Sequence, residues 1–300
     1  MKTKILFRTL LIIFLFSVIL PFSIQFSSSQ EHYDLEGINV AVYKDSGTES
    51  LPESYIALRN MFEWMNASVD YISVDQIQDG NLKNYDFLCM PGGDPYDYYY
   101  SLENKGKNNI RNFIRFGGCY FGICGGSILG TENFLNIFKG RLNSPFPEIG
   151  SGIIMQNMTI NRNSEGPDLS EQPENCTTLY WSSGYFTADD MSKIIPITFY
   201  PGSAESGMIA FKYGSGAVFL CSPHPEFEEN DNRDGTTIFD SYNDPDSEWD
   251  LMLRVSIWLV NTSWDMRPLI WLGIIVGVVG IGVIITLTLY LVKRKRSNSL

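Results

Sequence analysis

A cysteine set among glycines is the residue of this sequence best suited to covalent chemistry. Cys124 lies within Gly122-Ile123-Cys124-Gly125-Gly126, directly after an apolar run that begins at Cys119. This pattern predicts a buried strand that turns sharply into a helix, with Cys124 exposed at the turn. Glycines on both sides leave room for the strained backbone of a nucleophile elbow, and the positive end of the helix dipole favours a thiolate. A buried structural cysteine is the alternative that this motif alone leaves open.

A nucleophilic thiol needs a base, and histidine is the usual one because it titrates near neutral pH. The chain has two histidines. His32 lies beside the predicted cleavage site of a signal segment and is a poor candidate. His224 follows an apolar strand-like run and stands between two prolines that restrict its backbone. Glu226 can accept a hydrogen bond from the imidazole and orient it, so the sequence predicts a Cys124–His224–Glu226 triad.

Acyl chemistry also needs donors that stabilise a developing oxyanion, and backbone N–H groups commonly supply them. Gly125 follows the predicted nucleophile, and Gly93 ends a Pro-Gly-Gly turn after another apolar run, so both are predicted donors. We expect Gly92, Asp94 and Tyr185 to contact the substrate. Further aromatic residues are predicted at the rim of the pocket, namely Tyr96, Tyr98, Tyr99, Tyr100, Tyr180, Trp181 and Phe186. An ordinary turn is the alternative for the Pro-Gly-Gly segment.

The elements that must position these residues follow from the hydrophobic pattern. Strands are predicted at 38–43, 69–74, 85–90 and 119–123, with helices over 52–66 and from about 110 to 117 between them. Alternating strands and helices indicate a parallel sheet covered on both faces, whose sites lie at the carboxyl ends of the strands. Further strands are predicted at 153–160, 177–187 and 194–200, then a hairpin over 208–222, and a closing helix over 247–259.

Three motifs of the chain resemble the class I glutamine amidotransferase-like superfamily. They are Pro91-Gly92-Gly93, the elbow from Gly117 to Gly126, and Ser222-Pro223-His224-Pro225-Glu226. The resemblance covers about 38–260 and is nearest to the branch found as the N-terminal domain of biotin-protein ligases. It implies an α/β fold, a flavodoxin-like three-layer sandwich with a mostly parallel central sheet. It also implies hydrolysis of an amide of glutamine or a related small substrate, without a cofactor or a metal.

Both ends of the chain have apolar segments. The pattern of 1–29 is that of a signal peptide, or else of an uncleaved signal anchor. The uncharged stretch 268–292 would reach about 37 Å as a helix and is predicted to cross a membrane, with the basic tail 293–300 on the cytoplasmic side. The folded domain is predicted at 34–260, outside the cytoplasm, joined by a linker at 261–267.

Charge, sequons and cysteines agree with an exported domain. All 34 acidic residues lie between the two apolar segments with 15 basic residues, a net charge of −19 that argues against nucleic acid as a partner. Asn66, Asn157, Asn175 and Asn261 begin glycosylation patterns. Besides Cys124 there are four cysteines, which an oxidising compartment could pair in three ways, although Cys89 and Cys119 also suit a core.

Two functions from different classes fit these patterns. The first is a membrane-anchored hydrolase of an amide, a peptide or a similar small acyl substrate. The second is a surface module that holds a ligand in the same crevice without turning it over, which would make the triad idle. Gly273 and Gly277 in the predicted membrane segment would also allow two helices to associate as a homodimer.

Overall fold

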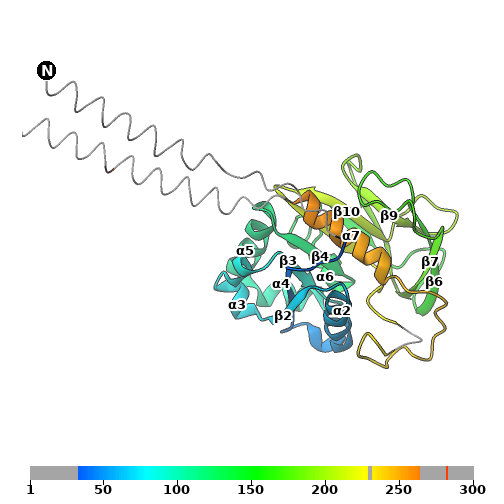
Figure 1. Ribbon diagram of the computed structural model, residues 1–300, viewed down its shortest axis with the longest axis horizontal. Coiled ribbons are helices and arrows are strands. Elements are labelled where there is room, and N and C mark those ends of the chain that lie inside the picture. The colour runs from blue at the N-terminus through cyan, green and yellow to red at the C-terminus, as the bar shows by residue number, and fades with distance from the viewer. Residues whose placement is uncertain (1–32, 229–231, 264–281, 283–300) are drawn as a thin grey trace, which may run out of the picture. The chain divides into compact units, whose positions relative to one another are not determined.

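The computed structural model describes residues 33–228, 232–263 and 282. Apart from Gly282, these fall within one compact unit that spans Glu31–Asp265 (Figure 1). The predicted signal segment 1–29, the basic tail 293–300 and all of 268–292 except Gly282 lie outside the described residues, as does His32.

Five strands form the parallel half of the main sheet. They are β1 (Asn39–Tyr43), β2 (Ser68–Ile72), β3 (Phe87–Met90), β4 (Cys119–Ile123) and β11 (Gly216–Cys221). Their order across the sheet is β2-β1-β3-β4-β11, and each neighbouring pair is parallel. This is the strand order of flavodoxin-like sheets. β3, β4 and β11 are buried along their whole length, which explains why they are almost entirely apolar.

The other half of the sheet is antiparallel. Beyond β11 it continues through β10 (Met208–Tyr213), β9 (Ile195–Phe199), β6 (Ile153–Ile160) and β7 (Asn175–Trp181). Every pairing from β11 outward is antiparallel. The prediction of a mostly parallel sheet was therefore wrong, and the fold is α/β with a large mixed sheet. The tight turn at Gly214-Ser215 reverses the chain, so β10 and β11 pair antiparallel. A parallel pair would need a long crossover between its strands.

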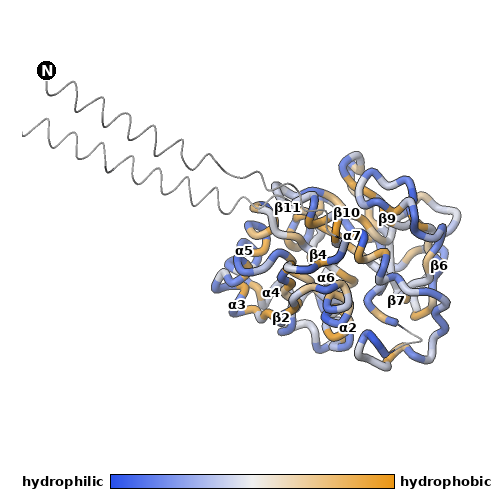
Figure 2. Tube along the Cα trace, in the orientation of Figure 1, coloured by the Kyte–Doolittle hydropathy of each residue, from blue (hydrophilic) through white to orange (hydrophobic). Residues whose placement is uncertain are grey.

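Helices cover both faces of the parallel half of the sheet, which gives three layers there (Figure 1). On one face lie α2 (Pro52–Trp64) and α7 (Trp249–Thr262); on the other lie α3 (Val74–Gln78), α4 (Pro95–Ser101), α5 (Glu103–Arg115) and α6 (Gly125–Leu129). Alternate residues of each strand face opposite layers, so that Phe121 of β4 packs on Phe62 of α2 while Tyr120 joins the other core. Figure 2 shows the apolar residues gathered along the central strands.

Two local predictions differ from the structure. The predicted strand 177–187 is interrupted at Ser182, whose φ of 45° turns the chain. Its second part, β8 (Tyr185–Ala188), pairs with β5 (Gly140–Asn143) in a separate two-stranded sheet. The predicted strand 69–74 ends at Ile72 because Ser73 and Gln76 form a capping box that starts α3.

The transmembrane part of the fold prediction is corrected. None of the helices described within 33–228 and 232–263 is both long and apolar enough to cross a bilayer. All five cysteines of the chain are described and none forms a disulfide. Cys89 and Cys119 lie in the core, as one alternative expected. The four sequon asparagines are all exposed, and their glycosylation stays a prediction.

Candidate active site

Cys124 stands at a strained turn between β4 and α6. Its φ of 47° and ψ of −110° are unusual for a residue with a side chain. The backbone N–H of Cys124 donates to the carbonyl of Cys221 in the neighbouring strand β11, at 2.8 Å. Because β4 is held in register with β3 and β11 on either side, the turn cannot relax by shifting the strand. The half-buried thiol therefore projects beyond the carboxyl end of the sheet.

Glycines allow the elbow to pack directly against the loop that follows β3. A Cβ atom on Gly125 would lie 2.0 Å from the carbonyl oxygen of Gly93, and one on Gly126 would lie 2.1 Å from that of Met90. No side chain fits in either place. The N–H of Gly126 donates to the carbonyl of Pro91 at 3.0 Å, so elbow and loop form one rigid unit.

His224 and Glu226 are buried together after β11. The Nδ1 atom of His224 lies 2.9 Å from Oε1 of Glu226, and both side chains are fully buried. The N–H of His224 donates to the carbonyl of Leu179 at 2.9 Å, which ties this segment to β7. The Nε2 atom has no hydrogen bond of good geometry within the described residues, and the thiol of Cys124 is the group that interacts with the imidazole on its other side.

The charges around His224 favour its protonated form. Burial alone is the largest influence and lowers the pKa. The negative charges of Glu226 and Cys124, with the hydrogen bonds that these two groups accept from the imidazole, outweigh burial and raise the pKa of His224 from 6.5 to about 10. The site therefore holds a protonated imidazole beside the sulfur of Cys124.

Ser54 of α2 connects the predicted triad to the glycine loop. Its hydroxyl donates to Oε1 of Glu226 at 2.7 Å and accepts the N–H of Gly92 at 2.8 Å. Ser54 was not among the residues predicted for the site. One feature of the sequence does point to Ser54. It precedes Ala57 by three positions and Leu58 by four, so it lies on the buried face of the same helix. A hydroxyl buried on that face needs a hydrogen-bond partner.

Two backbone N–H groups beside the thiol are left without an acceptor. The neighbouring amides are all engaged: that of Gly92 with Ser54, that of Asp94 with the carbonyl of Gly47, and that of Gly126 with Pro91. Among the described residues, no acceptor is found for the N–H groups of Gly93 and Gly125. These are the two donors that the sequence analysis named for an oxyanion.

The other predicted contact residues are placed less directly. Gly92 lies beside the imidazole, since a Cβ atom there would be 2.9 Å from Cε1 of His224. The carboxylate of Asp94 turns away to cap α4, where it accepts the N–H of Tyr96 at 2.8 Å. Tyr185 packs edge-on against Phe146 and does not line the pocket described below.

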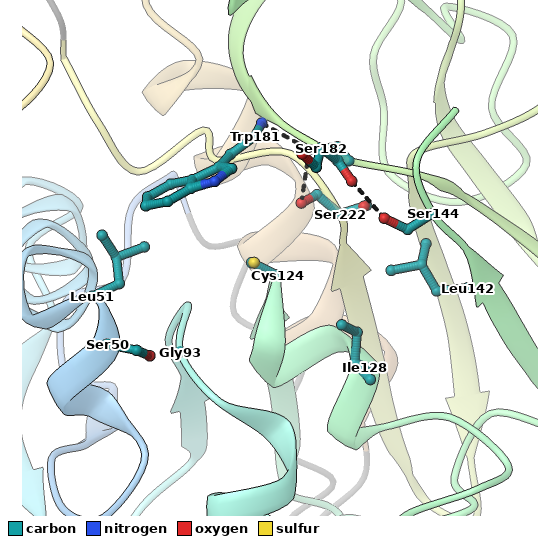
Figure 3. A pocket seen from close by; sticks show the side chains of 11 residues that line it. Ser50, Leu51, Gly93, Cys124, Ile128, Leu142, Ser144, Trp181, Ser182 and Ser222 are labelled. Carbon is teal, nitrogen blue, oxygen red and sulfur yellow. Dashed lines mark hydrogen bonds between the residues drawn. The ribbon is translucent and has the colours of Figure 1, made fainter. Parts of the chain in front are cut away.

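A pocket of about 310 Å³ opens above the thiol (Figure 3). In Figure 3, Ser50, Leu51 and Gly93 lie on one side of Cys124, and Ile128, Leu142 and Ser144 lie on the other. Trp181, Ser182, Ser183 and Ser222 complete the lining. Of the aromatic residues predicted at the rim, only Trp181 lines this pocket. Tyr98 is instead fully buried, and its hydroxyl donates to the carbonyl of Gly92 at 3.0 Å, so it supports the glycine loop from below.

One acidic cluster lies outside this pocket. Asp244, Asp246 and Glu248 each bring a carboxylate oxygen within 4.8 Å of the others. They already serve the fold, because Asp244 accepts the N–H of Asp246 at 3.1 Å and Asp246 accepts that of Thr177 at 3.2 Å. We assign no cofactor or metal to them.

The comparisons with known proteins agree with the resemblance seen in the motifs. Residues 38–138 match the family model described as "Biotin-protein ligase, N terminal". This range contains the glycine loop and the elbow but ends before His224 and Glu226. The family resemblance is therefore confirmed for 38–138. The assignment of His224 and Glu226 to the site rests on their positions in the structure.

Two curated proteins are similar to part of the chain. An uncharacterised protein of Chlamydia muridarum is 27% identical over 159 residues, which cover 47% of this chain and 60% of that protein. The biotin–protein ligase of Schizosaccharomyces pombe is 26% identical over 172 residues, 51% of this chain and 27% of the ligase. The chain therefore spans less than two thirds of either relative. Among solved structures, a glutamine amidotransferase of Thermotoga maritima is 14% identical with a TM-score of 0.44, over 79% of this chain and 94% of that one.

Proposed function

Because residues 38–138 match the N-terminal region of biotin-protein ligases in a chain with glutamine amidotransferase-like motifs, we propose that the protein is a hydrolase with a cysteine nucleophile. Its substrate is an amide or a related small acyl compound. The observation that carries the proposal is the surroundings of Cys124: a histidine whose pKa is raised to about 10 on one side, and two unengaged N–H groups on the other.

In the proposed first step, the Cys124 thiolate attacks the carbonyl carbon of the substrate. The carbonyl oxygen becomes negative and accepts hydrogen bonds from the N–H groups of Gly93 and Gly125. The C–N bond then breaks, and the leaving amine takes its proton from Nε2 of His224. A thioester between the acyl group and Cys124 remains, with a neutral imidazole beside it.

In the proposed second step, water hydrolyses the thioester. Neutral His224 takes one proton from the water as its oxygen attacks the acyl carbon. The C–S bond breaks, the acid leaves, and the thiolate and imidazolium are restored. Glu226 keeps the imidazole in one orientation throughout, and Ser54 keeps Glu226 and the glycine loop in place.

Alkylation of the folded protein tests the nucleophile. We expect iodoacetamide at neutral pH to modify Cys124 faster than the same cysteine in the unfolded chain, because a thiolate reacts and a thiol does not. The other thiols serve as internal controls: Cys89, Cys176 and Cys221 are buried, and burial raises the pKa of each well above its usual value. If Cys124 reacts no faster than it does in the unfolded chain, the proposal fails.

Trapping of the acyl intermediate tests the reaction itself. The protein is incubated with a panel of acyl amides and activated esters, quenched in acid, and its intact mass is measured. We expect an acyl adduct on the wild type and none on Cys124→Ser. If Cys124→Ser keeps its affinity for a ligand that the wild type never acylates, the protein is a binding module with an idle triad.

A further inference from the structure

Among the residues that the structure describes, the lining of the pocket above Cys124 includes no acidic or basic side chain. Its apolar surface comes from Leu51, Ile128, Leu142 and Trp181, and the rest of its lining consists of serines, a glycine and Cys124 itself (Figure 3). A free amino acid carries an ammonium and a carboxylate beside its α-carbon. The described lining offers neither group an opposite charge, so burying either of them in the pocket would remove its water without compensation, which is unfavourable.

Charged residues next to the pocket in the sequence are engaged elsewhere. Glu49, which precedes Ser50, accepts the N–H of Gly47 at 2.7 Å. Asp94, which follows Gly93, caps α4. Arg141, which precedes Leu142, forms an ion pair with Glu132 at 2.9 Å. None of the three is directed to a ligand in the pocket.

The imidazolium of His224 cannot serve a substrate carboxylate either. It is fully buried, donates to the carboxylate of Glu226 and lies against Cys124, so its charge is already balanced within the chain. The serines do not replace a charge, since several are bonded within the chain. Ser222 Oγ accepts the N–H of Gly184 at 2.7 Å, and Ser144 Oγ donates to the carbonyl of Ser182.

We propose that the substrate of this site is an uncharged acyl group, such as a side-chain or main-chain amide within a peptide, and that the free glutamine zwitterion is excluded. This inference rests on the proposed function, because it assumes that the thiol above which the pocket opens is the nucleophile. The apolar side chains would hold the carbon chain of the acyl group, while serine hydroxyls and backbone groups would contact neutral amides beside it.

Two reagents that share one reactive group but differ in the charges beside the α-carbon test whether charge excludes a ligand from the pocket. One is a diazomethyl ketone analogue of L-glutamine with its amino and carboxylate groups free, and the other is the same compound N-acetylated and carboxamidated. We expect the blocked reagent to label Cys124 at least about tenfold faster at neutral pH. Labelling by the free form at an equal or higher rate, or no labelling by the blocked form, would overturn the inference.

Iodoacetamide, which is small and neutral, is run in parallel and reports on the nucleophile alone. Rapid alkylation of Cys124 by iodoacetamide, combined with no preference between the two ketones, would reject the neutral substrate and leave the proposed hydrolase standing. Slow alkylation by iodoacetamide would reject the hydrolase and this inference with it.

A charge placed in the pocket gives a reciprocal test. Ser144 is exposed on the wall opposite Leu51. We expect Ser144→Lys to raise labelling by the free zwitterion about tenfold relative to the blocked reagent, because the ammonium can pair with its carboxylate. Ser144→Gln is the matched control of similar length without charge and should keep the preference of the wild type. An equal shift in the two variants would contradict the role of charge.

Discussion

At the scale of single residues, the site depends on a chain of hydrogen bonds that ends at the imidazole. The N–H of Gly92 donates to Ser54, Ser54 donates to Glu226, and Glu226 accepts from His224. All of these groups are buried, so each bond is made in a medium of low dielectric constant and the loss of one member leaves its partners unsatisfied. The chain couples the orientation of the base to the position of the glycine loop.

Substitution of Ser54 tests this coupling. We expect Ser54→Ala to lower the rate of thioester formation about tenfold or more, because a hydrogen bond to a charged group contributes about 1.5–3 kcal/mol. Ser256→Ala is the matched control, since Ser256 is equally buried on α7, on the same face of the sheet, and its hydroxyl has no hydrogen-bond partner within the described residues. Rates are measured by trapping the acyl-enzyme. Equal rates in the two variants would show that Ser54 has a structural role only.

A change in the pH dependence would separate positioning from packing. The rate of Cys124 alkylation is expected to depend on pH through the protonation of His224. If Ser54 positions Glu226, then Ser54→Ala shifts the apparent pKa of this pH profile, whereas a loss of packing alone leaves the apparent pKa unchanged. Ser54→Thr retains the hydroxyl and should recover part of the rate.

The protonation of His224 can be observed directly. Glu226 and Cys124 raise its pKa to about 10, so we expect an imidazolium at pH 8 and loss of the proton as the pH approaches 10. Proton binding by His224 stabilises the folded state. This contribution is fully present below about pH 6.5 and is lost as the pH rises through about 10. The imidazole resonances in NMR spectra report the titration, and His32→Gln leaves His224 as the one histidine of the chain.

The same spectra test the cause of the shift. Glu226→Gln removes one of the two negative charges, so the pKa of His224 should fall, and the neutral imidazole should appear at lower pH than in the wild type. An unchanged titration in Glu226→Gln, or a neutral His224 at pH 7, would contradict the electrostatic account.

At the scale of elements, the elbow and the glycine loop act as one unit because their backbones touch. Gly126 packs on the carbonyl of Met90 and Gly125 on that of Gly93, with no room for a side chain. Two buried tyrosines of the same core hold the unit, Tyr98 through the carbonyl of Gly92 and Tyr120 through the carbonyl of Gly126 at 2.6 Å. The two unengaged N–H groups are thereby fixed relative to the thiol.

A methyl group inserted into this contact should separate the two elements. We expect Gly126→Ala to slow alkylation of Cys124 and to lower the free energy of unfolding by about 1–3 kcal/mol, the usual cost of overpacking. The control is Gly106→Ala in α5, where the nearest atom, 3.1 Å away, is the end of a flexible leucine side chain. Alanine also favours helix there, so stability should stay within about 1 kcal/mol of the wild type. Denaturant unfolding and alkylation rates measure both effects.

At the scale of the whole molecule, an α/β sheet buries four of the five thiols and leaves one accessible. Cys89, Cys119, Cys176 and Cys221 are core residues, whereas Cys124 lies in the pocket. No two cysteines are bonded. The fold is therefore held together by its core, without a covalent link between elements.

A count of thiols tests this arrangement. Without reductant, the denatured protein should react with a thiol reagent at five positions, and the folded protein at Cys124 alone. A reductant should leave the melting temperature unchanged, since no disulfide is present to be broken. Three or fewer reactive thiols in the denatured protein would mean that a disulfide forms.

Much of the fold was determined by the sequence itself. The apolar run 119–123 and the hairpin turn at Gly214 have local causes, namely burial on both faces and turn-forming residues, so strands β4, β10 and β11 were predicted almost to the residue. The glycine spacing around Cys124 and the pair His224 and Glu226 likewise follow from local chemistry. The extent of the antiparallel half was missed, because hydrophobic pattern shows that a strand exists but not which neighbour it joins.

The surroundings of the thiol depend on contacts between residues that are far apart in the chain. Ser54 forms a hydrogen bond with Glu226, which lies 172 positions later in the chain, and no local sequence pattern predicts such a contact. Asp94 and Tyr185 were predicted to contact the substrate from their place in the sequence. In the structure Asp94 caps the N-terminus of α4 and Tyr185 packs against Phe146. Short-range spacing determines which groups can do chemistry, whereas long-range packing determines which of them meet.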